Sequence, residues 1–175
     1  VDGNVTLTPR DLDVLPSDAL VINVKNPPVP LVAAKGDGTD DTAALQAMFG
    51  YIPNTSTYGG DRGKSGAVIF FPLGNYGVSS QLNVNAIGVV LRGVSVESSV
   101  ITPLPGFVGE SVIRFTQPNN GYSNVGVGME KIALFMDGVD THGITVVKAY
   151  DGVTFSDVTV RNVADTKNGF RFIPN

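Results

Sequence analysis

Two carboxylates in the second half of the sequence have the spacing that a glycan-cleaving pair could use. Cleavage of a glycosidic bond usually requires two carboxyl groups about 5–10 Å apart. Asp137 and Asp140 share a predicted turn, so their carboxylates can approach each other. We therefore take them as the candidate catalytic acids, unless those acids lie outside this chain. The region's other acids are Glu97, Glu110, Glu130, Asp151, Asp157 and Asp165, of which the last three are typical of turns or solvent-facing positions.

Elimination chemistry on an acidic sugar would instead need a base, often Lys or Arg, and a cation to neutralise the uronate. The sequence offers such cations without ranking them: Arg92, Arg114, Lys131, Lys148, Arg161 and Arg171. Aromatic rings near turns can also stack on the apolar faces of sugars. We take Arg114, Tyr122 and Tyr150 as candidate substrate-binding residues. The alternative for Tyr150 is structural, because it ends a predicted strand.

An acidic cluster near the N-terminus is better explained by structure than by metal binding. Asp37, Asp40 and Asp41 could offer carboxylates to a hard cation. Asp40, Asp41 or Thr42 can instead cap a helix by accepting hydrogen bonds from its first N–H groups. No further ligand pattern follows, so we predict neither a metal ion nor another cofactor.

Two other motifs also have structural explanations. The segment 59–65 lacks the first glycine of a phosphate-binding loop, since Tyr58 occupies that place, and a predicted strand follows it. His142 is the only histidine, and it precedes Gly143 as Asn168 precedes Gly169. This position predicts a turn residue.

The segment 34–52 combines a glycine-rich turn with a short amphipathic helix. Gly36 and Gly38 suit a tight turn. The apolar residues that follow recur at intervals of three, four and seven, which places them on one helical face. They are Leu45, Met48, Phe49 and Ile52, and Pro53 is expected to end the helix.

The remaining chain has the periodicity of strands. We predict strands at 67–71, 81–84, 88–92 and 111–115. Six matches then recur at one fixed offset: Met129, Ile132, Leu134, Gly143, Ile144 and Val146 with Phe155, Val158, Val160, Gly169, Phe170 and Phe172. A fixed period of this length indicates stacked coils. The open end of such a stack exposes strand edges and core, which the helix can cover.

Three segments, 35–46, 71–76 and 87–93, resemble in order and spacing the N-terminal part of the pectate-lyase-like right-handed parallel β-helix superfamily. The resemblance implies an all-β, single-stranded, right-handed parallel β-helix with an N-terminal capping α-helix. The superfamily includes bacteriophage tailspikes, which are usually homotrimers, and secreted polysaccharide-degrading enzymes. The motif residues have structural roles, so the resemblance indicates the fold more strongly than the reaction.

Composition limits the class of protein. The chain has 175 residues, a net charge of −4 and no cysteine. The acidic balance argues against a nucleic-acid partner, and a disulfide scaffold is excluded. No apolar run is long enough to predict insertion into a membrane, and no signal peptide is visible. The sequence stops inside its repeat, so we expect it to be part of a longer protein.

Residues 1–30 differ from the rest and are interpreted as a neck or attachment segment before the β-helix at 31–175. A strand is expected at 19–24, and prolines at 27, 28 and 30 interrupt regular structure. Whether this segment packs on the β-helix or on another polypeptide is open.

The leading hypothesis is a bacteriophage tailspike or tail-fibre protein that binds, and in its full-length form degrades, host surface polysaccharide. It would be a homotrimer in the virion tail, outside the cell, with residues 1–30 contacting other tail proteins. The alternatives are a secreted polysaccharide lyase or glycanase, and a non-catalytic structural or adhesive stalk.

Overall fold

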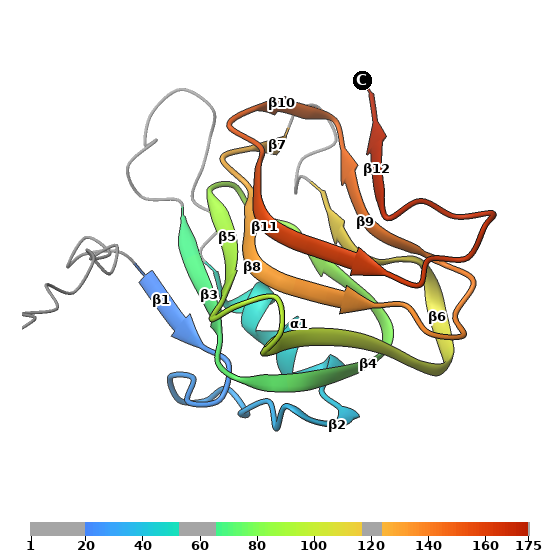
Figure 1. The fold of residues 1–175 in the computed structure, drawn as a ribbon. Coiled ribbons are helices and arrows are strands. Elements are labelled where there is room, and N and C mark those ends of the chain that lie inside the picture. Colours follow the sequence, from blue (N-terminus) through green and yellow to red (C-terminus); the bar gives the residue numbers. More distant parts are fainter. Residues whose placement is uncertain (1–19, 53–65, 117–123, 175) are drawn as a thin grey trace, which may run out of the picture.

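The structure is a computed structural model that describes residues 20–52, 66–116 and 124–174, with the backbone alone for residues 124–125 and 149–151. Its strands pair in parallel with strands of the neighbouring coils, and together they form three faces (Figure 1). This is the right-handed parallel β-helix predicted from the sequence.

The first face consists of β1 (Leu20–Asn23), β3 (Ala67–Phe71), β5 (Val89–Gly93) and the first parts of β8 (Gly128–Phe135) and β11 (Thr154–Arg161). The second consists of β2 (Asp37–Asp40), the first parts of β4 (Gly74–Val84) and β6 (Ser99–Phe115), and the second parts of β8 and β11. The third consists of the ends of β4 and β6 with β9 (His142–Val147) and β12 (Phe170–Ile173). A separate short pair joins β7 (Asn124–Val125) to β10 (Ala149–Asp151).

The strand register confirms the fixed repeat of the last coils. In β8 and β11, Ile132 lies beside Val158, and the partners of Met129 and Leu134 are also those expected. In β9 and β12, Ile144 lies beside Phe170. Parallel stacking satisfies the backbone groups of each coil through its neighbours, so one coil cannot be stable alone.

Inward-facing side chains form columns through the core. Ile22, Ile69, Leu91 and Met129 are successive neighbours in register on the first face, and each has no exposed surface. Burial of one such side chain contributes about 1.5–3 kcal/mol. The column therefore holds four coils together from within.

The helix α1 (Thr42–Tyr51) covers the β4 edge as expected (Figure 1). Leu45, Met48, Phe49 and Ile52 are all buried. The side-chain amide of Gln46 also bonds both backbone groups of Asn83, donating to its carbonyl at 3.0 Å and accepting from its N–H at 2.8 Å. Thus the helix supplies hydrogen bonds that a further strand would otherwise supply.

Capping was predicted for Asp40, Asp41 or Thr42, and Asp40 accepts the N–H of Thr42, the first helical residue, at 2.9 Å. Asp41 is the N-cap residue, but its carboxylate makes no cap hydrogen bond. It accepts instead from the backbone N–H groups of Lys35 at 2.7 Å and Gly36 at 2.9 Å. The carboxylate turns back because the preceding turn brings two other N–H groups to it.

Several predicted strands are parts of longer elements. The strand at 67–71 is β3, whereas those at 81–84 and 111–115 are the last portions of β4 and β6. Residues 20–23 of the expected neck pair with β3 and so belong to the first face. Residues 1–19 and Pro53 lie outside the described residues.

No helix in the described ranges is long and apolar enough to cross a membrane.

Candidate functional site on the third face

A row of polar side chains crosses the third face from coil to coil. Asn83, Arg114, Thr145 and Arg171 are successive neighbours in register on β4, β6, β9 and β12. Strand side chains alternate between two faces. Since Leu82, Ile113 and Ile144 next to them are fully buried in the core, this row faces outward.

One carboxylate joins the two arginines of the row. Glu110 accepts a hydrogen bond from the Nη1 atom of Arg114 and another from that of Arg171. These bonds, first from Arg171 and then from Arg114, hold the pKa of Glu110 below its usual value. We call Glu110, Arg114 and Arg171 the arginine cluster. With one anion and two cations, it carries a net positive charge on an acidic protein.

Thr145 lies between the two arginines and has no exposed surface. Neighbouring strands are about 4.8 Å apart, so the long side chains of the rungs on either side can cover it. Its hydroxyl is buried without a hydrogen-bond partner in the structure. A buried polar group without a partner is uncommon and costs about 1–3 kcal/mol.

His142 lies at the start of β9, beside the cluster. It is the first residue of a strand paired with Ser111, so the prediction of a turn residue was wrong. Its Nδ1 accepts the N–H of Asn168 at 3.0 Å. Burial first, and then the charges of Arg171 and Lys167, lower the pKa of His142. Because Nδ1 accepts the Asn168 N–H, Nε2 is the nitrogen that carries the proton when the imidazole is neutral.

Asp137 and Asp140 each contact a residue on the next coil. Asp137 accepts from the side-chain amide of Asn162. Asp140 accepts from the Thr166 hydroxyl at 2.9 Å, and its second oxygen lies 3.6 Å from the Lys167 ammonium. Both carboxylates thus join adjacent coils, and Thr166 follows Asp140 at the same offset as the repeat of the last coils.

A family model described as rhamnogalacturonase A/epimerase, pectate lyase-like matches residues 29–173.

The chain belongs to this pectate lyase-like family.

Solved structures share its fold. ORF18 of Geobacillus virus E2 matches with a TM-score of 0.72 and 27% identity, over 83% of this chain and 26% of the phage protein. The A-module of the mannuronan C-5 epimerase AlgE6 from Azotobacter vinelandii matches with a TM-score of 0.60 and 21% identity, over 87% of this chain and 40% of that one. The chain thus spans less than half of either protein. A search among curated proteins found no match.

In this pectate lyase-like chain, the structure places Arg114 within the arginine cluster. Tyr122 lies outside the described residues, and for Tyr150 only the backbone, in β10, is described. Sequence reasoning listed Arg171 without ranking it and gave Glu110 and Thr145 no role. Arg114 and Thr145 are neighbours in register. Their separation in sequence differs from the fixed offset of the last coils, so that offset could not predict their pairing.

The three carboxylates of the acidic cluster near the N-terminus all accept hydrogen bonds from nearby groups of the protein. Asp37 accepts from Thr39, Asp40 from Thr42 and Ser79, and Asp41 from the turn at 35–36. Within the described ranges, no group of three or more His, Cys, Asp or Glu residues could hold a metal ion.

Proposed function

We propose that the third face binds an acidic polysaccharide, and that the protein is part of a phage-associated or other polysaccharide-processing β-helix. The observation that carries this proposal is the arginine cluster. Guanidinium groups bind carboxylates through planar, bidentate hydrogen bonds. The side chains of Arg114 and Arg171 lie two rungs apart and are about a quarter to a third exposed. A polysaccharide that runs across the coils could therefore place its acidic sugars against both.

Glu110 limits the affinity of this site for an acidic ligand. It keeps both guanidiniums in place but also neutralises half of their charge. An acidic sugar would compete with Glu110 for the same N–H groups. Displaced arginine side chains would also uncover the unpartnered hydroxyl of Thr145, which could then bond a sugar hydroxyl.

The phage ORF18 match supports a virion protein, and the family description supports action on polysaccharide. We therefore keep the tailspike or tail-fibre as the leading form of the proposal, with host surface polysaccharide as the ligand. Asp137 and Asp140 remain the proposed acids of a hydrolytic site within this chain. In the structure their carboxylates contact Asn162, Thr166 and Lys167 of the next coil, so a hydrolytic role would require these contacts to open.

Binding is tested with polygalacturonate and alginate as acidic probes and dextran as a neutral one, by affinity electrophoresis. Arg171→Gln or Arg114→Gln should weaken acidic binding about tenfold or more, because a charge-assisted hydrogen bond contributes about 1.5–3 kcal/mol. Glu110→Gln should strengthen it, since the cluster gains one unit of charge.

Arg92→Gln is the matched control. Arg92 pairs with Glu130 at 2.7 Å on the first face, with similar exposure of the side chain. Equal loss in this variant, or equal binding of dextran by the wild type, would refute the proposed site.

Processing is tested on the same polymers by reducing-end release and by the absorbance of a new double bond. Reducing ends alone indicate hydrolysis, and both signals together indicate elimination. If Asp137→Asn and Asp140→Asn leave hydrolysis unchanged, these two acids are not catalytic. Light scattering then tests the homotrimer expected of a tailspike.

A further inference from the structure

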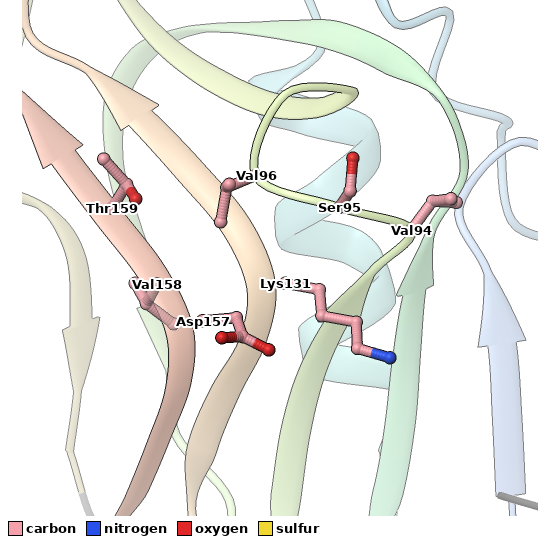
Figure 2. Close-up of a pocket in the computed structure, with 7 residues that line it drawn as sticks. All are labelled: Val94, Ser95, Val96, Lys131, Asp157, Val158 and Thr159. Atoms are coloured by element: carbon pink, nitrogen blue, oxygen red, sulfur yellow. The ribbon is translucent and has the colours of Figure 1, made fainter.

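A concavity lies at the corner between the first and second faces, away from the arginine cluster. It is a pocket of about 330 Å³, open to solvent. Figure 2 shows its seven lining residues, which come from the loop after β5 and from the corner residues of β8 and β11. They are Val94, Ser95, Val96, Lys131, Asp157, Val158 and Thr159.

The corner brings Lys131 and Asp157 to the same wall of the pocket. They occupy equivalent positions on adjacent coils, and both have left-handed backbone conformations, with φ of 54° and 51°. On the preceding coil Gly93 takes the corner, because a Cβ atom there would lie 2.2 Å from the carbonyl oxygen of Lys131. The backbone positions of Lys131 and Asp157 are therefore one rung apart, or roughly 4.8 Å.

The opposite wall is a loop fixed at both ends. The buried Ser99 hydroxyl donates to the Phe71 carbonyl at 2.8 Å and accepts from the N–H of Val94 at 2.9 Å. The Ser95 carbonyl accepts from the N–H groups of both Ser98 and Ser99. This wall is preformed, so a ligand need not order it on binding.

An ion pair ties the tip of the same loop to a distant coil. Glu97 contacts Arg161 of β11 at 2.6 Å. The loop is therefore attached to coils on both sides of the pocket.

The residues that line the pocket combine apolar, hydroxyl and charged groups, as expected of a site for an acidic sugar. Valine side chains provide apolar surface, and Ser95 and Thr159 provide hydroxyls. In the described part of the chain, neither Lys131 nor Asp157 has a hydrogen-bond or ion-pair partner, so both charges are available to a ligand. The volume is at the low end of ligand pockets, enough for one sugar unit and too small for a long polymer segment.

We propose that this corner pocket is an accessory site for a single uronic acid unit. Its carboxylate would bind the ammonium of Lys131, its hydroxyls would donate to Asp157, and its apolar ring face would lie on Val94 and Val158. The site lies on a different face from the arginine cluster. The choice of a sugar rests on the proposed function, whereas the need for an anion with hydroxyls over an apolar surface comes from the pocket itself.

The test is a titration of the labelled full chain, followed by amide chemical shifts. Sodium galacturonate is the probe, galactose lacks its charge, and acetate lacks its ring. Galacturonate should shift the amides of residues 94–96, 131 and 157–159, and bind at least several-fold more tightly than galactose or acetate. Equal binding of either control, or shifts confined elsewhere, would overturn the proposal.

Lys131→Asn should reduce the affinity for galacturonate about tenfold, because asparagine tolerates the left-handed conformation but lacks the charge. Lys148→Asn is the matched control, since Lys148 has the same conformation, with φ of 55°, at another corner. Val94→Glu is a second variant at an exposed position and should also weaken binding by repulsion. An effect of Lys148→Asn equal to that of Lys131→Asn, or no effect of both pocket variants, would contradict the proposed site.

Arg171→Gln separates this proposal from the previous one. It should leave the pocket shifts unchanged while polymer binding falls. Pocket binding without polymer binding would refute only the third-face proposal, and polymer binding without pocket shifts would refute only this one.

Discussion

At the scale of single residues, Asp41 has the most buried carboxylate of the acidic segment, with 3% of its surface exposed. It accepts two backbone N–H groups that have no other partner in the turn. Asp41→Asn should lower the free energy of unfolding by about 1–3 kcal/mol, because one N–H would face an amide donor. Urea denaturation measures this loss.

Asp37→Asn is the control for Asp41, because Asp37 is exposed and its carboxylate accepts hydrogen bonds only from Thr39, two residues away. It should change the urea midpoint much less than Asp41→Asn. Equal losses in the two variants would show that the Asp41 contacts do not stabilise the turn.

Asp40 makes stability depend on pH in the acid range. Hydrogen bonds from the hydroxyl of Thr42 and then from that of Ser79 lower its pKa from 3.8 to about 2. A carboxyl group with a lower pKa in the folded state stabilises it above the unfolded value, and this contribution is lost as pH falls from about 4 to 2. Asp40→Asn should therefore destabilise the protein at neutral pH and differ less from wild type at pH 2.

Urea midpoints measured from pH 6 to pH 2 test this dependence. A difference between Asp40→Asn and wild type that stays constant across the range would contradict the assigned pKa.

The sequence predicted residue types better than residue partners. It indicated that Asp40 and Asp41 are structural, but the partners of Asp41 depend on how the turn at 35–36 closes. Arg114 was selected for its charge, yet Glu110 and Arg171 join it only through strand register. The contact between Glu110 and Arg171 links distant parts of the sequence across irregular coils, where local patterns carry no information.

At the scale of secondary-structure elements, close stacking of coils restricts some glycines and not others. A Cβ atom on Gly128 in β8 would lie 2.1 Å from the carbonyl oxygen of Thr154 in β11. Gly128→Ala should therefore force the strands apart and cost about 1–3 kcal/mol.

Gly50 of α1 provides the opposite case, because nothing lies within 4 Å of its added Cβ atom. Gly50→Ala should stabilise the protein by about 0.5–1 kcal/mol through helix propensity. Thermal unfolding compares the two variants. A stabilised Gly128→Ala would show that the coils are not in close contact there.

The elements differed in how well they could be predicted. The helix and its buried residues followed from the regular helical period, and β3 followed from its apolar run. The lengths of β4 and β6 could not be predicted, because each turns a corner between two faces without a break. Glycine, proline and polar residues inside β6 indicate a loop locally, yet β6 runs unbroken over Ser99–Phe115 and pairs with β4 at both ends and at Val108.

At the scale of the whole molecule, the coils repeat only where the turns have the same length. The coil that leads from Leu91 to its neighbour Met129 is longer than the next one, which leads from Met129 to Phe155. The repeat was visible in the last coils for this reason, and earlier coils were identified by family resemblance. The faces that carry the two proposed sites could be assigned only after the register was known.

Stability in a stack should vary with the number of neighbouring coils. The central strand β8 pairs with β5, β6 and β11, whereas β12 pairs only with β9 among the described strands. Phe170 and Phe172 in β12 are also partly exposed, at 38% and 56%. Since local opening costs less where fewer contacts are broken, amide hydrogen exchange should be slowest in β5 and β8 and much faster in β12. Exchange measured by mass spectrometry on proteolytic fragments tests this gradient. Equal protection of β8 and β12 would instead show that the coils unfold as one cooperative unit, and nearest-neighbour stacking would then be the wrong description of this β-helix.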